Sequence, residues 1–284
     1  MSERLRMPSP LGALLVWLGA LIAVLAASVG TVSLAIALRA ASGKLLRSEL
    51  SDPASSPIAT SPGWFIVGAI TTQATVGLVL ALVLLLGHFD RRAILPFRSA
   101  RPSAYAGALL VTFGVAPLAQ VVGELMTRLQ HIPSHSSLIV SRMAQSATST
   151  EFSLLLATLS LLPALVEESM FRGYMTAAFQ RHSFWARAII PSLFFGVFHL
   201  EFAQGAATVL LGFGFGLVRL YSGSLLPSML AHAAYNGAVL LVARAVPAVE
   251  DHEIEALPVV IGAGLLALGL EILRQGAPLP AHRA

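Results

Sequence analysis

The chain has 284 residues, of which 56% are apolar and only 11% are charged; its formal net charge is +4 and it contains no cysteine. Ordinary soluble domains carry about 25% charged residues, so a mean hydropathy of +0.79 excludes a water-soluble globular domain and a disordered chain. The lack of cysteine excludes disulfides and thiolate metal sites, and the basic residues lie between apolar segments rather than in one run, which predicts a lipid bilayer and no nucleic acid as partner.

Eight apolar segments follow one another, and a membrane-spanning helix needs about 20 mostly apolar residues. Four segments are uncharged and long enough by themselves: Leu11–Leu38, Trp64–Gly87, Ser103–Gly123 and Leu220–Ala243. The other four are shorter or end in ionisable residues: Phe152–Val166, Ala188–Phe198, Phe202–Val218 and Ala256–Leu270. The first segment is too long for the core of a signal peptide, so we expect it to remain as a helix. We therefore predict an all-α, polytopic membrane helix bundle of about eight transmembrane helices.

The segments form one integrated membrane domain with three parts. Residues 1–150 supply an N-terminal three-helix region with its loops, 151–246 a core that carries the polar side chains, and 247–284 the last helix and a tail. We expect a polar external connection at Ala40–Gly63 and an interfacial helix around Leu138–Ala147. With a cytoplasmic N-terminus, about twice as many lysines and arginines fall inside as outside, which favours both termini in the cytoplasm. Because Lys44 is the only lysine, a bacterial cytoplasmic membrane is favoured.

Three short patterns place ionisable or amide side chains in apolar segments, where a charged group costs about 2.5–3.5 kcal/mol. They are Glu167-Glu168-Ser169-Met170-Phe171-Arg172, Phe195-Gly196-Val197-Phe198-His199 and His232-Ala233-Ala234-Tyr235-Asn236. Residues four apart share a helix face, so Glu168 and Arg172 are expected to form an ion pair. Glu167 lies about 100° around the helix from Glu168 and is free to face a cavity.

The three patterns lie at similar depths in their helices. At about 1.5 Å per residue, Glu167 is roughly 18 Å from the inner end of the fourth helix, and His199 is roughly 24 Å along the fifth. His232 and Asn236 are roughly 12 and 18 Å along the seventh. We therefore expect a glutamate, two histidines and an asparagine to meet in one polar pocket.

Such a set supports two kinds of hydrolysis. A carboxylate can act as general base toward water while a histidine shares the proton, and a second histidine and an amide can donate hydrogen bonds to an oxyanion. Alternatively, Glu167, His199 and His232 can bind zinc and leave a position open for water. The spacing leaves both possibilities open.

The three patterns, in this order and on hydrophobic helices, resemble the CPBP (Abi) family of type II CAAX prenyl proteases and bacteriocin-processing or immunity proteins. The resemblance covers roughly Phe152–Ala245. It implies an intramembrane endopeptidase in which Glu167, helped by His199, activates water, while His232 and Asn236 form the oxyanion hole. The supporting residues would be Glu168, Arg172 and Phe195. No cofactor is favoured, with zinc as the alternative, since asparagine is a poor zinc ligand but a good oxyanion donor.

The expected substrate is a peptide or a lipidated protein at the membrane, reached from the cytoplasmic leaflet. In a prokaryote a peptide, a bacteriocin precursor or a membrane regulator is favoured over a prenylated protein. The alternative is a non-catalytic immunity protein or scaffold, or a small transporter, that uses the same pocket for binding. Two further features are expected to be structural: Gly212-Phe213-Gly214-Phe215-Gly216 as a helix-packing surface, and Pro163 and Pro191 as helix kinks that free carbonyl groups near the pocket.

Overall fold

The computed structural model describes residues 5–45, 57–131, 135–246 and 256–276. Over these ranges the chain is helical, and its only extended pairing is an isolated bridge between Arg6 and Phe89. Seven of the helices are long and apolar enough to cross a membrane. The predicted all-α polytopic bundle is therefore confirmed. Residues 46–56 of the predicted external connection Ala40–Gly63 lie outside the described residues.

The seven long helical segments are α1 (Pro10–Ala41), α4 (Pro62–Leu86), α6 (Pro102–Gln130), a continuous run over Ser149–Ala178, α12 (Phe202–Ser222), α13 (Leu226–Ala245) and α14 (Ala256–Gln275). The continuous run comprises α8 (Ser149–Leu156), the π-helix η2 (Ala157–Leu161), α9 (Leu162–Glu167), the π-helix η3 (Glu168–Met175) and α10 (Thr176–Ala178). The shorter helices are α3 (Pro57–Thr60), α5 (Arg91–Ile94), α7 (His135–Ser146) and α11 (Phe184–Phe198).

Two predicted spans differ from the structure. The expected fifth span is α11, which has 15 residues and is therefore about 22 Å long, shorter than the hydrocarbon core of a bilayer. The break between the sixth and seventh spans lies at Gly223, not at Arg219, so Leu220 belongs to α12 rather than to the next helix. Gly223 ends α12 because its φ of +68° is left-handed, and its N–H caps the carbonyl of Arg219 at 3.1 Å.

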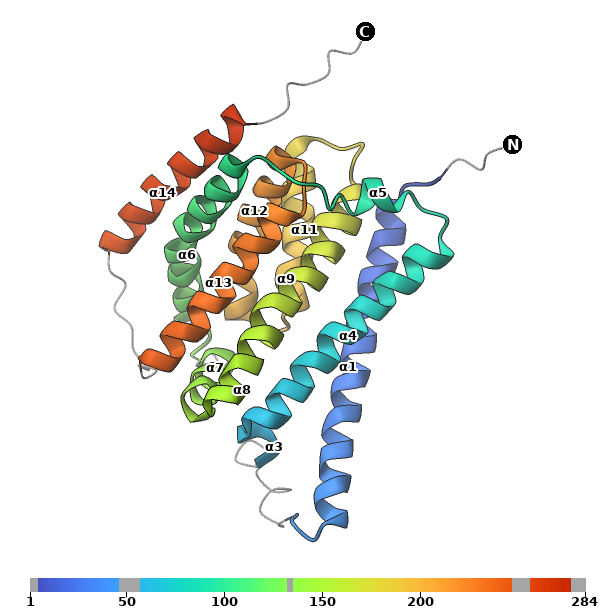
Figure 1. Ribbon diagram of the computed structural model, residues 1–284, viewed down its shortest axis with the longest axis vertical. Helices are drawn as coiled ribbons and strands as arrows, with labels where there is room; N and C mark the ends of the chain where they lie inside the picture. The colour runs from blue at the N-terminus through green and yellow to red at the C-terminus, as the bar shows by residue number, and fades with distance from the viewer. Residues whose placement is uncertain (1–4, 46–56, 132–134, 247–255, 277–284) are drawn as a thin grey trace.

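Figure 1 shows the helices as a bundle in which α1 and α4 form one edge and α6 and α14 the other. Between these edges lie the run from α8 to α10, then α11, α12 and α13. α1 begins and α14 ends at the same end of the bundle, where α5 also lies, whereas α7 lies at the opposite end (Figure 1). α7 overlaps the interfacial helix predicted around Leu138–Ala147.

Small residues let the central helices approach closely. A Cβ atom built on Gly216 of α12 would lie 3.3 Å from the carbonyl oxygen of Ala188 on α11, and one on Gly205 would lie 2.8 Å from that of Gly196. Gly214 faces α6 instead, 3.5 Å from side-chain atoms of Val111 and Val115. The prediction that the glycine-rich stretch of α12 is a packing surface is therefore confirmed.

Candidate active site

The two adjacent glutamates lie where α9 changes to the π-helix η3, in the middle of the bundle. Glu168 and Arg172 are fully buried, and Arg172 Nη1 lies 3.1 Å from Glu168 Oε1. This is the ion pair that the four-residue spacing predicted. A buried pair of this kind needs further partners to offset the loss of solvent, and each residue has one, although Glu168 Oε2 and Arg172 Nε remain without a hydrogen-bond partner.

Glu167 is held by two residues from other helices. Its Oε1 accepts a hydrogen bond of 2.7 Å from the side-chain amide Nε2 of Gln73 on α4. Its Oε2 lies 3.8 Å from Nε2 of His232 on α13, a distance too long for a direct hydrogen bond. Glu167 therefore faces the same space as His232, and one of its two carboxylate oxygens is fixed.

His232 lies between the two glutamates. Its Nδ1 is 3.0 Å from Glu168 Oε1, while its Nε2 is the atom that faces Glu167. A carboxylate that is ion-paired to an arginine accepts hydrogen bonds, so Nδ1 carries the hydrogen that Glu168 receives. The ring stacks on Phe215 with 4.8 Å between centroids and 14° between planes, which fixes its tilt.

Arg172 connects this cluster to α11 and α12. Its Nη2 donates a 2.8 Å hydrogen bond to the carbonyl oxygen of Gly212, and its guanidinium lies 4.5 Å from the ring centroid of Phe195. The Phe195 ring in turn makes an edge contact with His232 at 5.9 Å. Phe195 therefore contacts both the buried ion pair and His199.

His199 is the C-cap residue of α11 and is bound to its own helix. Its Nδ1 lies 2.9 Å from the carbonyl oxygen of Phe195, and its ring makes an edge contact with the Phe195 ring at 5.0 Å. A carbonyl oxygen only accepts hydrogen bonds, so Nδ1 is the donor, and in the neutral form of the ring Nε2 carries a lone pair. In the part of the chain that the structure describes, no hydrogen bond or ion pair joins His199 to Glu167, which His232 approaches instead.

Asn236 donates a hydrogen bond to the helical run that carries the glutamates. Its side-chain Nδ2 donates a 2.9 Å hydrogen bond to the carbonyl oxygen of Leu159, in η2. Pro163 follows Leu159 by four residues and has no N–H, so it cannot supply the helical hydrogen bond that this carbonyl would receive. Beside it, Ser160 donates to the carbonyl oxygen of Ala233 at 2.7 Å. The carbonyl that the sequence predicted to be freed by Pro163 is therefore bonded by Asn236.

Gln73 is a site residue that the sequence analysis missed. It is 6% exposed, lies outside all three patterns, and its Oε1 is buried without a hydrogen-bond partner. The only sequence signal is an amide side chain within the uncharged segment Trp64–Gly87. That segment contains no ionisable group that would mark it as part of a site.

The alternative zinc site fits the described side chains poorly. Among them, no group of three or more histidine, aspartate and glutamate residues lies close enough together to hold a metal ion. His232 has one ring nitrogen on Glu168 and the other toward Glu167, and Nδ1 of His199 bonds to the carbonyl oxygen of Phe195. We therefore derive no step through a metal.

One comparison with known proteins found a match. Residues 149–238 match the family model described as type II CAAX prenyl endopeptidase Rce1-like, which confirms the resemblance seen in the sequence. The matched region contains all three patterns and, at the level of the family, supports an integral membrane protein and a CAAX-protease-like intramembrane endopeptidase; it does not support a metalloprotease in particular. No curated protein and no solved structure matches the chain.

Proposed function

We propose that this chain, whose residues 149–238 are Rce1-like, is an intramembrane endopeptidase that hydrolyses a peptide bond with water activated by Glu167. The observation that carries the proposal is the placement of one Glu167 oxygen on Gln73 and of the other toward His232. A fixed carboxylate with one free oxygen, in a site shielded from bulk water, is what a general base needs.

In the proposed reaction, Oε2 of Glu167 takes a proton from a water molecule. The hydroxide oxygen bonds to the carbonyl carbon of the substrate, and the carbonyl oxygen becomes an oxyanion. Glu167 then gives the proton to the amide nitrogen as the carbon–nitrogen bond breaks, which releases an acid and an amine. No covalent intermediate with the protein is formed.

His232 donates from Nε2 to the oxyanion in this proposal. The hydrogen bond from Nδ1 to Glu168 fixes the ring, and Phe215 sets its tilt, so the donor is oriented before the substrate arrives. Both ring nitrogens of His232 donate in this arrangement, so the proposed mechanism uses its imidazolium form. Glu168 and Arg172 act as positioning residues because they hold the ring and do not reach the reacting atoms.

The resemblance implies that His199 helps Glu167 and that Asn236 forms part of the oxyanion hole. In the structure, each of the two side chains bonds to a backbone carbonyl oxygen instead. Because Nδ1 of His199 bonds to the carbonyl oxygen of Phe195, Nε2 of the neutral ring can accept a hydrogen bond from water. Asn236 reaches an oxyanion only if its amide exchanges the Leu159 carbonyl for the substrate oxygen. The proposed reaction is metal-independent, and the zinc set of Glu167, His199 and His232 is not part of it.

The proposed substrate is a membrane-associated peptide or a lipidated protein, since the site is built among helices that cross the bilayer. We place the end of the bundle that carries α5 in the cytoplasm of a bacterial cell, with both termini on that side. Arg91, Arg92, Arg98 and Arg101 at this end support the orientation. The family match does not favour the alternative of a non-catalytic immunity protein, scaffold or transporter.

The test replaces Glu167 by glutamine, which keeps the shape of the side chain and removes the base. Membranes that contain the wild type, Glu167→Gln or Glu271→Gln are compared for new peptide termini by quantitative mass spectrometry. Glu271 is exposed near the end of α14 and serves as the matched control. We expect termini that depend on the wild type to disappear with Glu167→Gln and to persist with Glu271→Gln. Termini that persist in all three samples would reject the proposal.

A further inference from the structure

Three arginines gather where α11 begins and α12 ends; we call Arg98, Arg187 and Arg219 the arginine cluster. Arg219 lies in the last turn of α12, and Arg98 donates from Nε to the carbonyl oxygen of Gly223 at 2.9 Å. Arg187 precedes Ala188, and the backbone of Ala188 packs against Gly216 on α12. Both Arg98 and Arg187 are close enough to Arg219 to repel its charge.

The cluster has no acidic partner among the described residues. The Nε atoms of Arg187 and Arg219 are buried without a hydrogen-bond partner, and none of the three arginines forms an ion pair within that part of the chain. Other arginines near helix ends do form ion pairs, Arg128 with Glu124 and Arg274 with Glu271. The arginine cluster is therefore an uncompensated group of cations.

A structural role explains the cluster only in part. The carbonyl end of α12 attracts positive charge, which accounts for one arginine there, and the hydrogen bond to Gly223 accounts for the position of Arg98. Neither accounts for the two buried Nε donors of Arg187 and Arg219, or for placing a third cation beside them. Buried donors without acceptors are costly, and an anion would satisfy them and remove the repulsion.

We propose that the arginine cluster binds a phosphate group, that of an anionic phospholipid headgroup. A planar guanidinium presents paired donors that match phosphate oxygens, and basic pockets between transmembrane helices bind such headgroups. Aromatic side chains mark the same end of these two helices as a membrane interface. Phe184 contacts Tyr221 with 5.1 Å between ring centroids and Trp185 with 5.5 Å.

The site lies next to the catalytic candidates but does not depend on them. Arg219 follows Phe215 by four residues, so the two share a face of α12, and Phe215 stacks on His232. A bound headgroup would thus sit about one helical turn from the ring that supports His232. The inference holds whether or not the proposed peptidase activity is found, because it concerns binding alone.

The experiment measures lipid binding to the purified full-length chain in a neutral detergent. Phosphatidylglycerol, phosphatidylcholine and inorganic phosphate are added separately to the wild type, Arg187→Gln, Arg219→Gln and the control Arg274→Gln, whose arginine is exposed and paired with Glu271. We expect phosphatidylglycerol, but not phosphatidylcholine, to raise the melting temperature of the wild type and the control. This shift should be lost in both cluster variants, with binding weakened about tenfold or more.

Three further outcomes decide the proposal. Without lipid, the cluster variants should be at least as stable as the wild type because they relieve repulsion, and a loss of stability in both would overturn the proposal in favour of a structural role. A shift of equal size with inorganic phosphate, lost in the same variants, would support the phosphate site and assign it to the free ion. A phosphatidylglycerol shift that persists in both variants would overturn the proposal.

Discussion

The side-chain amide of Gln73 donates a 2.7 Å hydrogen bond to Oε1 of Glu167, across the contact between α4 and α9. This bond joins the N-terminal region to the carboxylate that acts as base in the proposed reaction, although Gln73 lies outside the residues that match the family model. It leaves Oε2 as the oxygen that faces His232. Gln73 is therefore a positioning residue for Glu167 in the proposed mechanism.

Replacing Gln73 by leucine should lower kcat about 10- to 100-fold, because a hydrogen bond to a charged group is worth about 1.5–3 kcal/mol. Gln73→Glu should be at least as damaging, since it removes the donor and places a second carboxylate against the first. Both are measured by turnover of a peptide substrate, with melting temperature recorded alongside. The control is Gln275→Leu, which removes an exposed glutamine–glutamate hydrogen bond of 3.0 Å. Equal activity in all four proteins would show that Gln73 does not position the base.

The Glu168–Arg172 ion pair is expected to affect the free energy of unfolding. Arg172→Met leaves Glu168 buried beside His232 without its cation, which should cost about 3–5 kcal/mol of unfolding free energy. Arg128→Met breaks a pair with the same four-residue spacing and a shorter distance of 2.7 Å, but at an exposed position. It should cost about 0–1 kcal/mol. Denaturant titration in detergent compares the two variants, and costs of similar size would mean that burial of the pair is not what matters.

The sequence predicted those parts of the site that depend on a single helix. Glu168 and Arg172 meet because four residues bring side chains to one face, and this relationship survives the change to a π-helix. The depths of Glu167 and His232 also agreed, since helix rise is nearly constant. The ranges of most spans followed from apolar length alone.

The missed parts depend on how helices rotate against each other. The spacing of His232 does not say that its two nitrogens face the two glutamates. The spacing of His199 does not say that its Nδ1 bonds to its own helix rather than to Glu167. Gln73 belongs to the site because α4 is oriented with this side-chain amide toward α9. An amide carries no charge, so its position in an apolar segment does not indicate a site. The shortness of α11 was visible in the sequence, because its apolar segment Ala188–Phe198 has too few residues to span a bilayer.

Asn236 and Pro163 should be energetically coupled through Leu159. In the wild type, Asn236→Ala leaves the Leu159 carbonyl without its donor, whereas in Pro163→Ala the new N–H can bond that carbonyl within the helix. Asn236→Ala should therefore cost less in the Pro163→Ala background, by about 0.6–1.7 kcal/mol. A double-mutant cycle of unfolding free energies measures this coupling. Additive costs would show that Leu159 is not the shared partner.

Chelation tests the metal-independent mechanism. We expect the purified protein to keep its peptidase activity after incubation with 1,10-phenanthroline and dialysis against EDTA, since the proposed water activation uses Glu167 and no metal ligand. A zinc-dependent peptidase in the same detergent serves as the control for complete removal. Loss of activity that returns with added zinc would contradict the mechanism and favour the set Glu167, His199 and His232.

The proposed orientation can be tested with single cysteines, because the chain has none of its own and each new thiol is unique. Ser42, after α1, and Val246, after α13, lie at the end of the bundle opposite α5, which contains Ala93 (Figure 1). All three are exposed. A membrane-impermeant maleimide should label Ser42→Cys and Val246→Cys in intact cells, and Ala93→Cys only after lysis.

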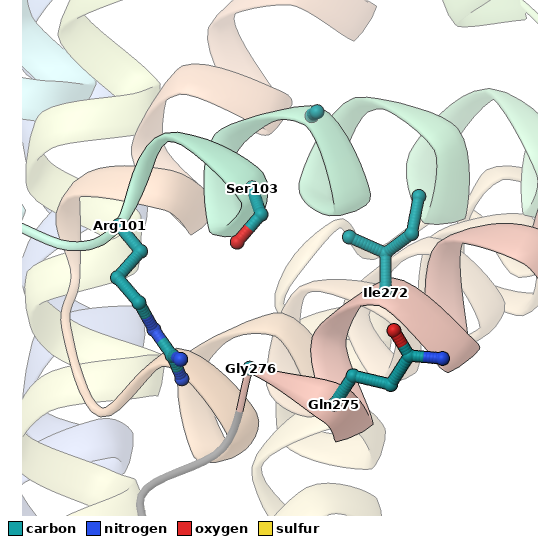
Figure 2. A pocket seen from close by; sticks show the side chains of 6 residues that line it. Arg101, Ser103, Ile272, Gln275 and Gly276 are labelled. Atoms are coloured by element: carbon teal, nitrogen blue, oxygen red, sulfur yellow. The ribbon is translucent and has the colours of Figure 1, made fainter.

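The cavity drawn in Figure 2 offers a further reporter for the end of the bundle that carries α5. It has a volume of about 430 Å³ and lies between the start of α6 and the end of α14, lined by Arg101, Ser103 and Gln275 among others. Since Ser103 is exposed there, Ser103→Cys should behave as Ala93→Cys does. Labelling of Ser103→Cys and Ala93→Cys in intact cells, with Ser42→Cys protected, would reverse the orientation. Even then, Ala93→Cys and Ser103→Cys should label together, and so should Ser42→Cys and Val246→Cys. These two groups follow from the fold, whereas the orientation was inferred from the distribution of charge.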